Sequence, residues 1–185
     1  MRVIAGTARS LPLKSVEGLE TRPTTDRIKE TLFNILQKDI VGSRFLDLFS
    51  GSGAIGIEAL SRGARQAVMI EYSKKCVSCI KENLAFTHLS DKAIVMEQDV
   101  IAALSRIPSK EVFDIIFMDA PYRQGYDKEV LQVLRDAPFI DPYTIIIIEE
   151  AINTDFSYIE EDSGFRITKI KKYKTNKHVF LNAVL

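Results

Sequence analysis

The stretch that decides the fold is a glycine-rich turn, Asp47-Leu48-Phe49-Ser50-Gly51-Ser52-Gly53-Ala54-Ile55-Gly56. An apolar, strand-like run at 45–49 enters it, and an apolar helical pattern follows from about 54 to 62. The G-x-G-x-x-G spacing between a strand and a helix is typical of sites where backbone approaches a nucleotide closely. By itself the turn is weak evidence, because it equally fits a dinucleotide site and a tight structural turn.

The segments beyond the turn alternate between strand and helix patterns. Further strands are expected at 67–71, 93–98, 113–118 and 144–149, and helices near 74–87, 101–107 and 128–137. This alternation predicts an α/β fold with a doubly wound, mostly parallel sheet. The runs 165–171 and 179–185 leave no room for a crossover helix, so we expect an antiparallel hairpin at a sheet edge.

The residues before the turn predict a short N-terminal extension that ends in a helix. Thr24 or Thr25 can cap this helix, which we expect to run to about Lys38. The length of 185 residues favours one domain, with the extension and helix in 1–40 and a catalytic sheet core in 44–185. A parallel sheet that ends in a hairpin resembles the Rossmann-like class I methyltransferase fold.

Acidic residues follow the first three strands, at Asp47, Glu71 and Asp99. Glu71 lies where an acid binds ribose hydroxyls, which fits both NAD and S-adenosylmethionine. Asp47 favours S-adenosylmethionine, because a carboxylate suits an ammonium and a sulfonium and disfavours a pyrophosphate. Asp99 fits an adenine amine with Val100 against the ring, or equally the N-cap of the next helix. The expected cofactor site also includes Phe49, Gly51, Ser52, Gly53, Tyr72 and Asp119.

The loop after the fourth strand reads Asp119-Ala120-Pro121-Tyr122 and resembles the Asp/Asn-Pro-Pro-Tyr/Phe motif of amino-group methyltransferases. An exocyclic amine is a poor nucleophile because its lone pair is delocalised into the ring. The Asp119 carboxylate and the Ala120 carbonyl would accept its hydrogens, Pro121 would stiffen the turn, and Tyr122 would stack on the base. Ala120 departs from the usual proline, but the carbonyl survives. The structural alternative is a turn capped by Asp119.

Composition and charge bound the remaining possibilities. The formal net charge is +0, yet basic residues gather towards both ends of the chain. We expect an RNA-binding face from Arg2, Arg9, Lys14, Lys171, Lys172 and Lys174, although a solvated basic surface is an equal alternative. No run reaches the length of a membrane span, and we expect a cytoplasmic protein. Cys76 and Cys79 read as reduced thiols, because a zinc site needs more ligands.

These motifs together resemble the RsmD family of bacterial 16S ribosomal RNA guanine-N2 methyltransferases. The resemblance rests on the start at 2–6, on the stretch 22–27 with its continuation at 30–34, and on the run 45–64. It implies S-adenosylmethionine as donor, a guanine of small-subunit rRNA as target, and action on ribosomal particles. The stretch 22–27 also suggests that Arg22 or Arg27 contacts the cofactor carboxylate and that Thr24 hydrogen-bonds it. The alternative is that this stretch only caps the following helix.

Three other functions share part of this pattern. A DNA adenine-N6 methyltransferase has the same tetrapeptide but usually carries an added recognition region. An NAD-dependent reductase is disfavoured by Asp47 and by the Asp119 loop. A non-catalytic RNA-binding module on this scaffold is favoured only by Ala120. We expect a monomer without a metal.

Overall fold

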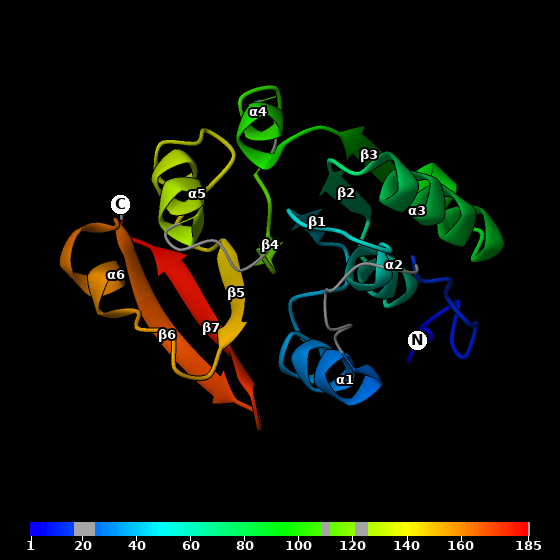
Figure 1. Cartoon of the computed structure of the whole chain (residues 1–185), viewed down its shortest axis with the longest axis horizontal. Helices are drawn as coiled ribbons and strands as arrows, with labels where there is room; N and C mark the ends of the chain where they lie inside the picture. Colours follow the sequence, from blue (N-terminus) through cyan, green and yellow to red (C-terminus); the bar gives the residue numbers. More distant parts are fainter. Residues whose placement is uncertain (17–24, 109–111, 121–125, 185) are drawn as a thin grey trace.

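The fold is built around one seven-stranded sheet. The structure is a computed structural model that describes residues 1–16, 25–108, 112–120 and 126–184. For residues 160–162 it describes the backbone only. The strand order is β3-β2-β1-β4-β5-β7-β6 (Figure 1). The strands are β1 Arg44–Asp47, β2 Gln66–Glu71, β3 Ala93–Glu97, β4 Ile115–Met118, β5 Ile145–Ala151, β6 Phe165–Lys172 and β7 Asn176–Ala183. The first five run parallel, and β7 is antiparallel to both β5 and β6. The predicted mostly parallel sheet with a C-terminal hairpin is confirmed.

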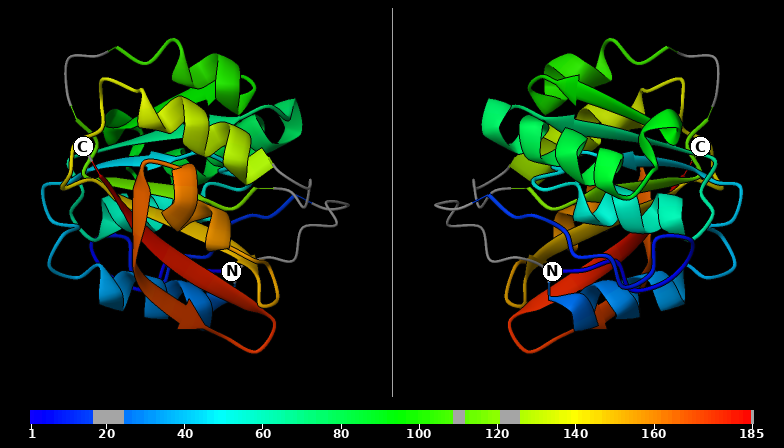
Figure 2. Two further views of the ribbon diagram at one scale, coloured as in Figure 1. Left: turned by 90° about the vertical axis from the view of Figure 1, so that its left-hand side faces the viewer. Right: turned by 90° about the vertical axis from the view of Figure 1, so that its right-hand side faces the viewer.

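Helices cover both faces of this sheet (Figure 2). They are α1 Asp26–Ile35, α2 Ala54–Ser61, α3 Lys74–Phe86, α4 Val100–Leu104, α5 Tyr126–Arg135 and α6 Ser157–Asp162, with a 3-10 turn at Ser90–Lys92. Successive strand residues point to opposite faces. Phe45 and Met69 therefore join the core under α1, α2 and α3, whereas Leu46 and Ile70 join the core under α4, α5 and α6.

Several element boundaries differ from those predicted. Thr25 caps α1 through its hydroxyl, as expected, but the helix ends at Ile35 instead of Lys38. The reason is a tighter turn, in which the Asp39 N–H bonds the Leu36 carbonyl three residues back (2.9 Å). The helix α6 was not predicted, because six residues give less than two turns of periodicity.

The N-terminal segment is fastened to the sheet core by a buried cluster of charges. The Lys29 ammonium, which is fully buried, lies 3.3 Å from a carboxylate oxygen of Glu58 and donates to the Arg2 carbonyl (2.5 Å). Glu58 also accepts from the backbone N–H groups of Ile4 (2.8 Å) and Ala5 (3.1 Å) and from Arg62 Nε (2.7 Å). A single carboxylate thus joins α1, α2 and the first residues of the chain.

Candidate active site

A deep cleft lies where the parallel strands end, beside the point at which the strand order reverses between β1 and β4. Ligands of open α/β sheets bind at this position. The cleft measures about 1370 Å³ and receives side chains from the glycine turn, the ends of β2, β3, β4 and β5, α1 and the β6–β7 hairpin. Its size exceeds what a single small ligand needs, so the cleft has room for two reactants.

Most of the predicted cofactor residues that the structure describes line this cleft. They are Phe49, Gly51, Ser52, Glu71, Tyr72, Asp99, Val100 and Asp119. Asp47 and Gly53 are buried within the glycine turn and are not among the lining residues. Arg22 and Thr24, and in the tetrapeptide Pro121 and Tyr122, fall outside the described residues.

The glycine turn is held against the second strand by Glu71. Its two carboxylate oxygens accept from the backbone N–H groups of Gly51 and Ser73, each at 2.9 Å. Gly53 begins α2 with φ +80°, a backbone conformation that suits glycine. A Cβ atom on Gly56 would lie 2.5 Å from the Met69 side chain, so glycine there lets α2 pack closely on β2. Gly53 and Gly56 therefore each have a local physical reason to be glycine.

Asp47 is almost fully buried at the end of β1. Its Oδ2 atom accepts from the Gly56 N–H (3.2 Å), and its Oδ1 atom has no hydrogen-bond partner among the described residues. Burial, and to a lesser degree the charge on Glu71, raise the pKa of Asp47 to about 7. A positively charged ligand group nearby would favour the ionised form of this carboxylate.

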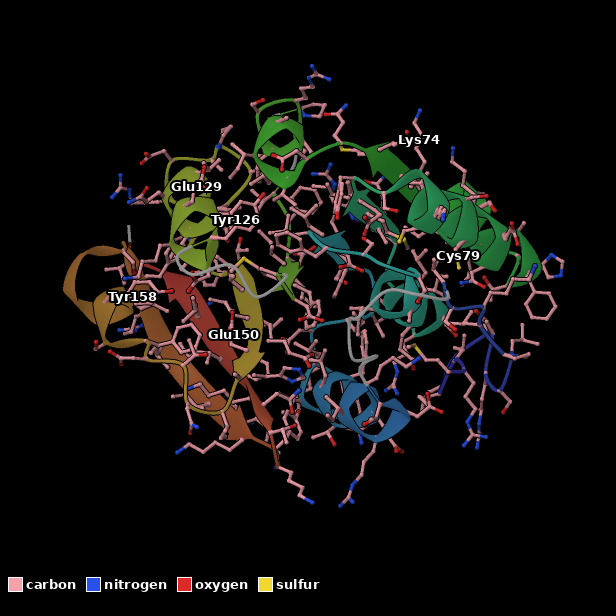
Figure 3. The ribbon with its side chains drawn as sticks, in the orientation of Figure 1. Lys74, Cys79, Tyr126, Glu129, Glu150 and Tyr158 are labelled. Atoms are coloured by element: carbon pink, nitrogen blue, oxygen red, sulfur yellow. The ribbon has the colours of Figure 1, made fainter. Side chains whose placement is uncertain are left out.

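Asp99 caps the helix that follows β3. Its Oδ1 atom accepts from the N–H groups of Ile101 (2.9 Å) and Ala102 (3.4 Å), and its Oδ2 atom accepts from the Tyr126 hydroxyl (3.0 Å). Tyr126, labelled in Figure 3, lies at the start of α5. It also packs edge-on against Phe49, with ring centroids 5.7 Å apart. The helix-cap interpretation is thus confirmed, and a role towards an adenine amine stays a prediction. Tyr126 was missed because its contact spans 27 residues of sequence.

Asp119 follows β4 and is open to the cleft, with the buried Ala120 behind it. Its pKa lies well above the ordinary value. The first cause is that protein atoms surround the carboxylate on the sides away from the cleft, and the second is repulsion by the carboxylates of Glu149, Asp47 and Glu150. A perturbed carboxyl group in a cleft is typical of a functional site.

A hydrogen-bonded network beside Asp119 was not predicted from the sequence. Glu149 Oε1 accepts from Asn176 Nδ2 (2.6 Å), and Glu149 Oε2 lies 2.9 Å from Nε2 of the fully buried His178. The Tyr173 hydroxyl lies 3.0 Å from His178 Nδ1. Glu149, Asn176 and Tyr173 line the cleft. Like Asp119, Glu149 lies near the carboxyl end of a parallel strand, so the same reasoning could have selected it from the sequence. Its partners lie on the hairpin, and no spacing in the sequence predicts them.

The basic residues divide between two environments. Lys171, Lys172 and Lys174, on the β6–β7 hairpin, line the mouth of the cleft. The N-terminal cations do not line it: Arg2 lies 3.4 Å from Asp26, Lys14 lies 2.6 Å from Glu82, and Arg9 is exposed. The hairpin is therefore the better candidate for contact with a polyanion.

The two cysteines lie one turn apart on α3 as free, buried thiols. Burial raises the pKa of both Cys76 and Cys79, which keeps them as thiols and weakens them as nucleophiles. Over the described part of the chain, no group of three His, Cys, Asp or Glu side chains is placed to hold a metal ion. Within the same residues, no helix is long and apolar enough to cross a bilayer.

The sheet order, the hairpin and the cleft at the strand ends define the class I methyltransferase fold. The solved structure of yhhF from Escherichia coli, named as a candidate methyltransferase, superposes with a TM-score of 0.85 at 31% identity, over 99% of this chain and 97% of that one. The predicted fold class is thereby confirmed.

The chain belongs to the family described as conserved hypothetical protein 95, whose model matches residues 1–182 and which is the RsmD family that the motifs resemble. It is 37% identical over 154 residues to ribosomal RNA small subunit methyltransferase D of Escherichia coli, covering 82% of this chain and 75% of that protein. It is also 37% identical over 152 residues to the protein of the same name from Haemophilus influenzae, covering 80% and 78%.

Proposed function

We propose that this protein transfers a methyl group from S-adenosylmethionine to the exocyclic N2 amine of a guanine in 16S ribosomal RNA. The observation that carries the proposal is that Asp119, the acid of the amino-methyltransferase motif, shares one cleft with Glu71, Asp99 and the glycine turn. The names of the relatives support an rRNA substrate, and such a substrate would place the protein in the cytoplasm.

The residues around the turn fit the proposed cofactor. Glu71 keeps lone pairs for ribose hydroxyls, since each of its oxygens accepts one backbone N–H. Asp99 offers an acceptor for the adenine amine, with Val100 and Tyr126 as apolar walls. The Oδ1 atom of Asp47, which has no hydrogen-bond partner among the described residues, would suit a cationic group nearby. When bound, S-adenosylmethionine supplies an electrophilic methyl group on a sulfonium.

The protein's own residues act on the amine. Asp119 and the Ala120 carbonyl accept hydrogen bonds from its two N–H groups, which favours a pyramidal nitrogen and stabilises the positive charge that develops there. The Asp119 carboxylate then takes up the proton that the methylated nitrogen releases. Holding two reactants in line within one cleft supplies a large part of the acceleration. No covalent enzyme intermediate is needed, and neither buried thiol is suited to form one.

The substrate is expected to be a small-subunit particle or its RNA, bound by the hairpin lysines. The test is to incubate the purified protein with labelled S-adenosylmethionine and unmodified small ribosomal subunits, digest the RNA, and identify and map the labelled nucleoside. N2-methylguanosine at one position is the expected result. N6-methyladenosine in DNA would favour the DNA methyltransferase alternative, and absence of transfer to any nucleic acid would contradict the proposal.

A further inference from the structure

A second carboxylate lies beside Asp119 at the ends of the central strands. β4 and β5 pair in parallel with Met118 opposite Ile148, so Asp119 and Glu149 are the next residues on two neighbouring strands. Neighbouring strands lie about 4.8 Å apart. Both acids line the cleft, and after burial the charge on Glu149 is the largest cause of the raised pKa of Asp119.

The Glu149 carboxylate is held in one orientation from both sides. A carboxylate only accepts hydrogen bonds, so the proton of His178 must lie on Nε2, which faces Glu149 at 2.9 Å. With the proton on Nε2, Nδ1 accepts from the Tyr173 hydroxyl (3.0 Å). Asn176 Nδ2 donates to the other carboxylate oxygen (2.6 Å). Each Glu149 oxygen therefore faces one fixed donor.

The same network orients the Asn176 side chain so that its amide oxygen points away from Glu149. A flipped Asn176 amide would set its oxygen against the carboxylate, so Nδ2 must face Glu149 and Oδ1 must face elsewhere. That Oδ1 atom is enclosed and has no hydrogen-bond partner within the described part of the chain. Two carboxylates, those of Asp119 and Glu149, therefore line this part of the cleft, while the Asn176 oxygen is enclosed behind them.

Such a wall suits only some base edges. Beside its exocyclic amine, guanine carries the N1–H donor, whereas adenine and cytosine carry a ring nitrogen that accepts. We infer that Glu149 is a specificity-determining residue, which accepts from guanine N1–H while Asp119 accepts from the N2 amine. Asn176, His178 and Tyr173 are positioning residues that orient Glu149. The inference rests on the proposed function and adds the reason why a guanine is chosen.

A carboxylate in this place rejects the wrong base by repulsion as well as by a missing hydrogen bond. A ring nitrogen lone pair would face the Glu149 oxygen, and that nitrogen would be left without a donor in a partly buried site. Sites that hydrogen-bond a substrate group discriminate strongly against analogues that lack it. A glutamine at this position has an N–H to offer and would relieve the mismatch.

The experiment replaces the guanine mapped above by 2-aminopurine in reconstituted small subunits. This base keeps the amine but has an acceptor at N1. We expect the wild-type ratio of kcat/KM for guanine over 2-aminopurine to exceed about 10², and we expect it to fall at least tenfold in Glu149→Gln. The ratio does not depend on the fraction of folded enzyme, so partial misfolding cannot imitate the effect. Glu150→Gln, the next residue on β5, which does not line the cleft, is the matched control.

A second variant covers the case in which Glu149→Gln does not fold. Asn176→Ala frees one side of the carboxylate and should lower the same ratio by a smaller factor, with unchanged affinity for S-adenosylhomocysteine. An unchanged ratio in the folded variants would overturn the inference and leave Glu149 as a structural partner of His178. If the wild-type protein methylates no guanine, the proposed function fails with it, so the two failures are distinguishable.

Discussion

The Glu71 carboxylate accepts the backbone N–H of Gly51 across 20 residues of sequence, at 2.9 Å, and so ties the end of β2 to the glycine turn. Glu71 thereby shapes the turn as well as lining the cleft, and its removal should disturb the proposed cofactor site in both ways.

Glu71→Ala should weaken binding of S-adenosylhomocysteine by roughly 1–3 kcal/mol, because a charge-assisted acceptor is lost and two backbone N–H groups lose their partner. Isothermal titration calorimetry measures the change. Glu97→Ala is the matched control, since Glu97 pairs with Glu71 in register on β3 but is exposed and does not line the cleft. Equal affinities for the two variants would argue against the proposed ribose contact.

Asp119→Ala should lower kcat by roughly 10²-fold or more, the scale of a lost preorganised acceptor. Affinity for S-adenosylhomocysteine should change little, since the turn, Glu71 and Asp99 are untouched. Single-turnover methylation of small subunits measures the rate. The double variant Cys76→Ala/Cys79→Ala should stay active, and an inactive cysteine variant beside a fully active Asp119→Ala would refute the mechanism.

The activity should depend on pH through Asp119. Its ionised carboxylate is a stronger acceptor than the protonated acid, whose O–H donates instead. Desolvation by the surrounding protein atoms, followed by the charges of Glu149, Asp47 and Glu150, raises its pKa. Activity should therefore fall as the pH drops through this raised pKa. Glu149→Gln removes a negative neighbour, lowers the pKa of Asp119 and should move the acid limb to lower pH. Profiles of kcat/KM between about pH 5 and pH 9 test this; a shift in the opposite direction would contradict the assignment.

Neutralising Lys171, Lys172 and Lys174 to glutamine should weaken RNA binding and flatten its salt dependence. Each lost phosphate contact with single-stranded RNA removes about 0.7 from the slope of log K against log salt. Binding of small-subunit RNA over a salt series provides the slope. Changing Lys74, Lys75 and Lys81 on α3, which do not line the cleft, alters net charge equally and should leave the slope closer to that of the wild type.

Lys29→Met should lower the free energy of unfolding by roughly 1–3 kcal/mol, because the buried Glu58 carboxylate loses its ammonium partner and keeps only Arg62 as a cationic partner. Burial lowers the pKa of Lys29 while Glu58 opposes this shift, so the charged form depends on the pair. Denaturant unfolding measures the change. Lys38→Met, at an exposed position after α1, should have an effect within experimental error.

Local patterns in the sequence determined the architecture. Alternation of apolar runs predicted the parallel strands, and the absence of a crossover between 165–171 and 179–185 predicted the hairpin. Asp47, Glu71, Asp99 and Asp119 were selected as candidate site residues because parallel strands bring their carboxyl ends to one edge, whatever the details of packing. The residue types at these ends also indicated the chemistry, since glycines allow the backbone to approach a nucleotide closely and acids accept hydrogen bonds from hydroxyl and amine groups.

Only the tertiary structure decided which side chains share the cleft. The register of β4 and β5 sets Glu149 beside Asp119, and the hairpin brings Asn176 and His178 to Glu149 from 27 and 29 residues away. It also separated the basic residues, with Lys171 at the cleft and Lys14 in an ion pair with Glu82. Such contacts depend on long-range packing and strand register, and neither is encoded in the spacing of residues along the chain.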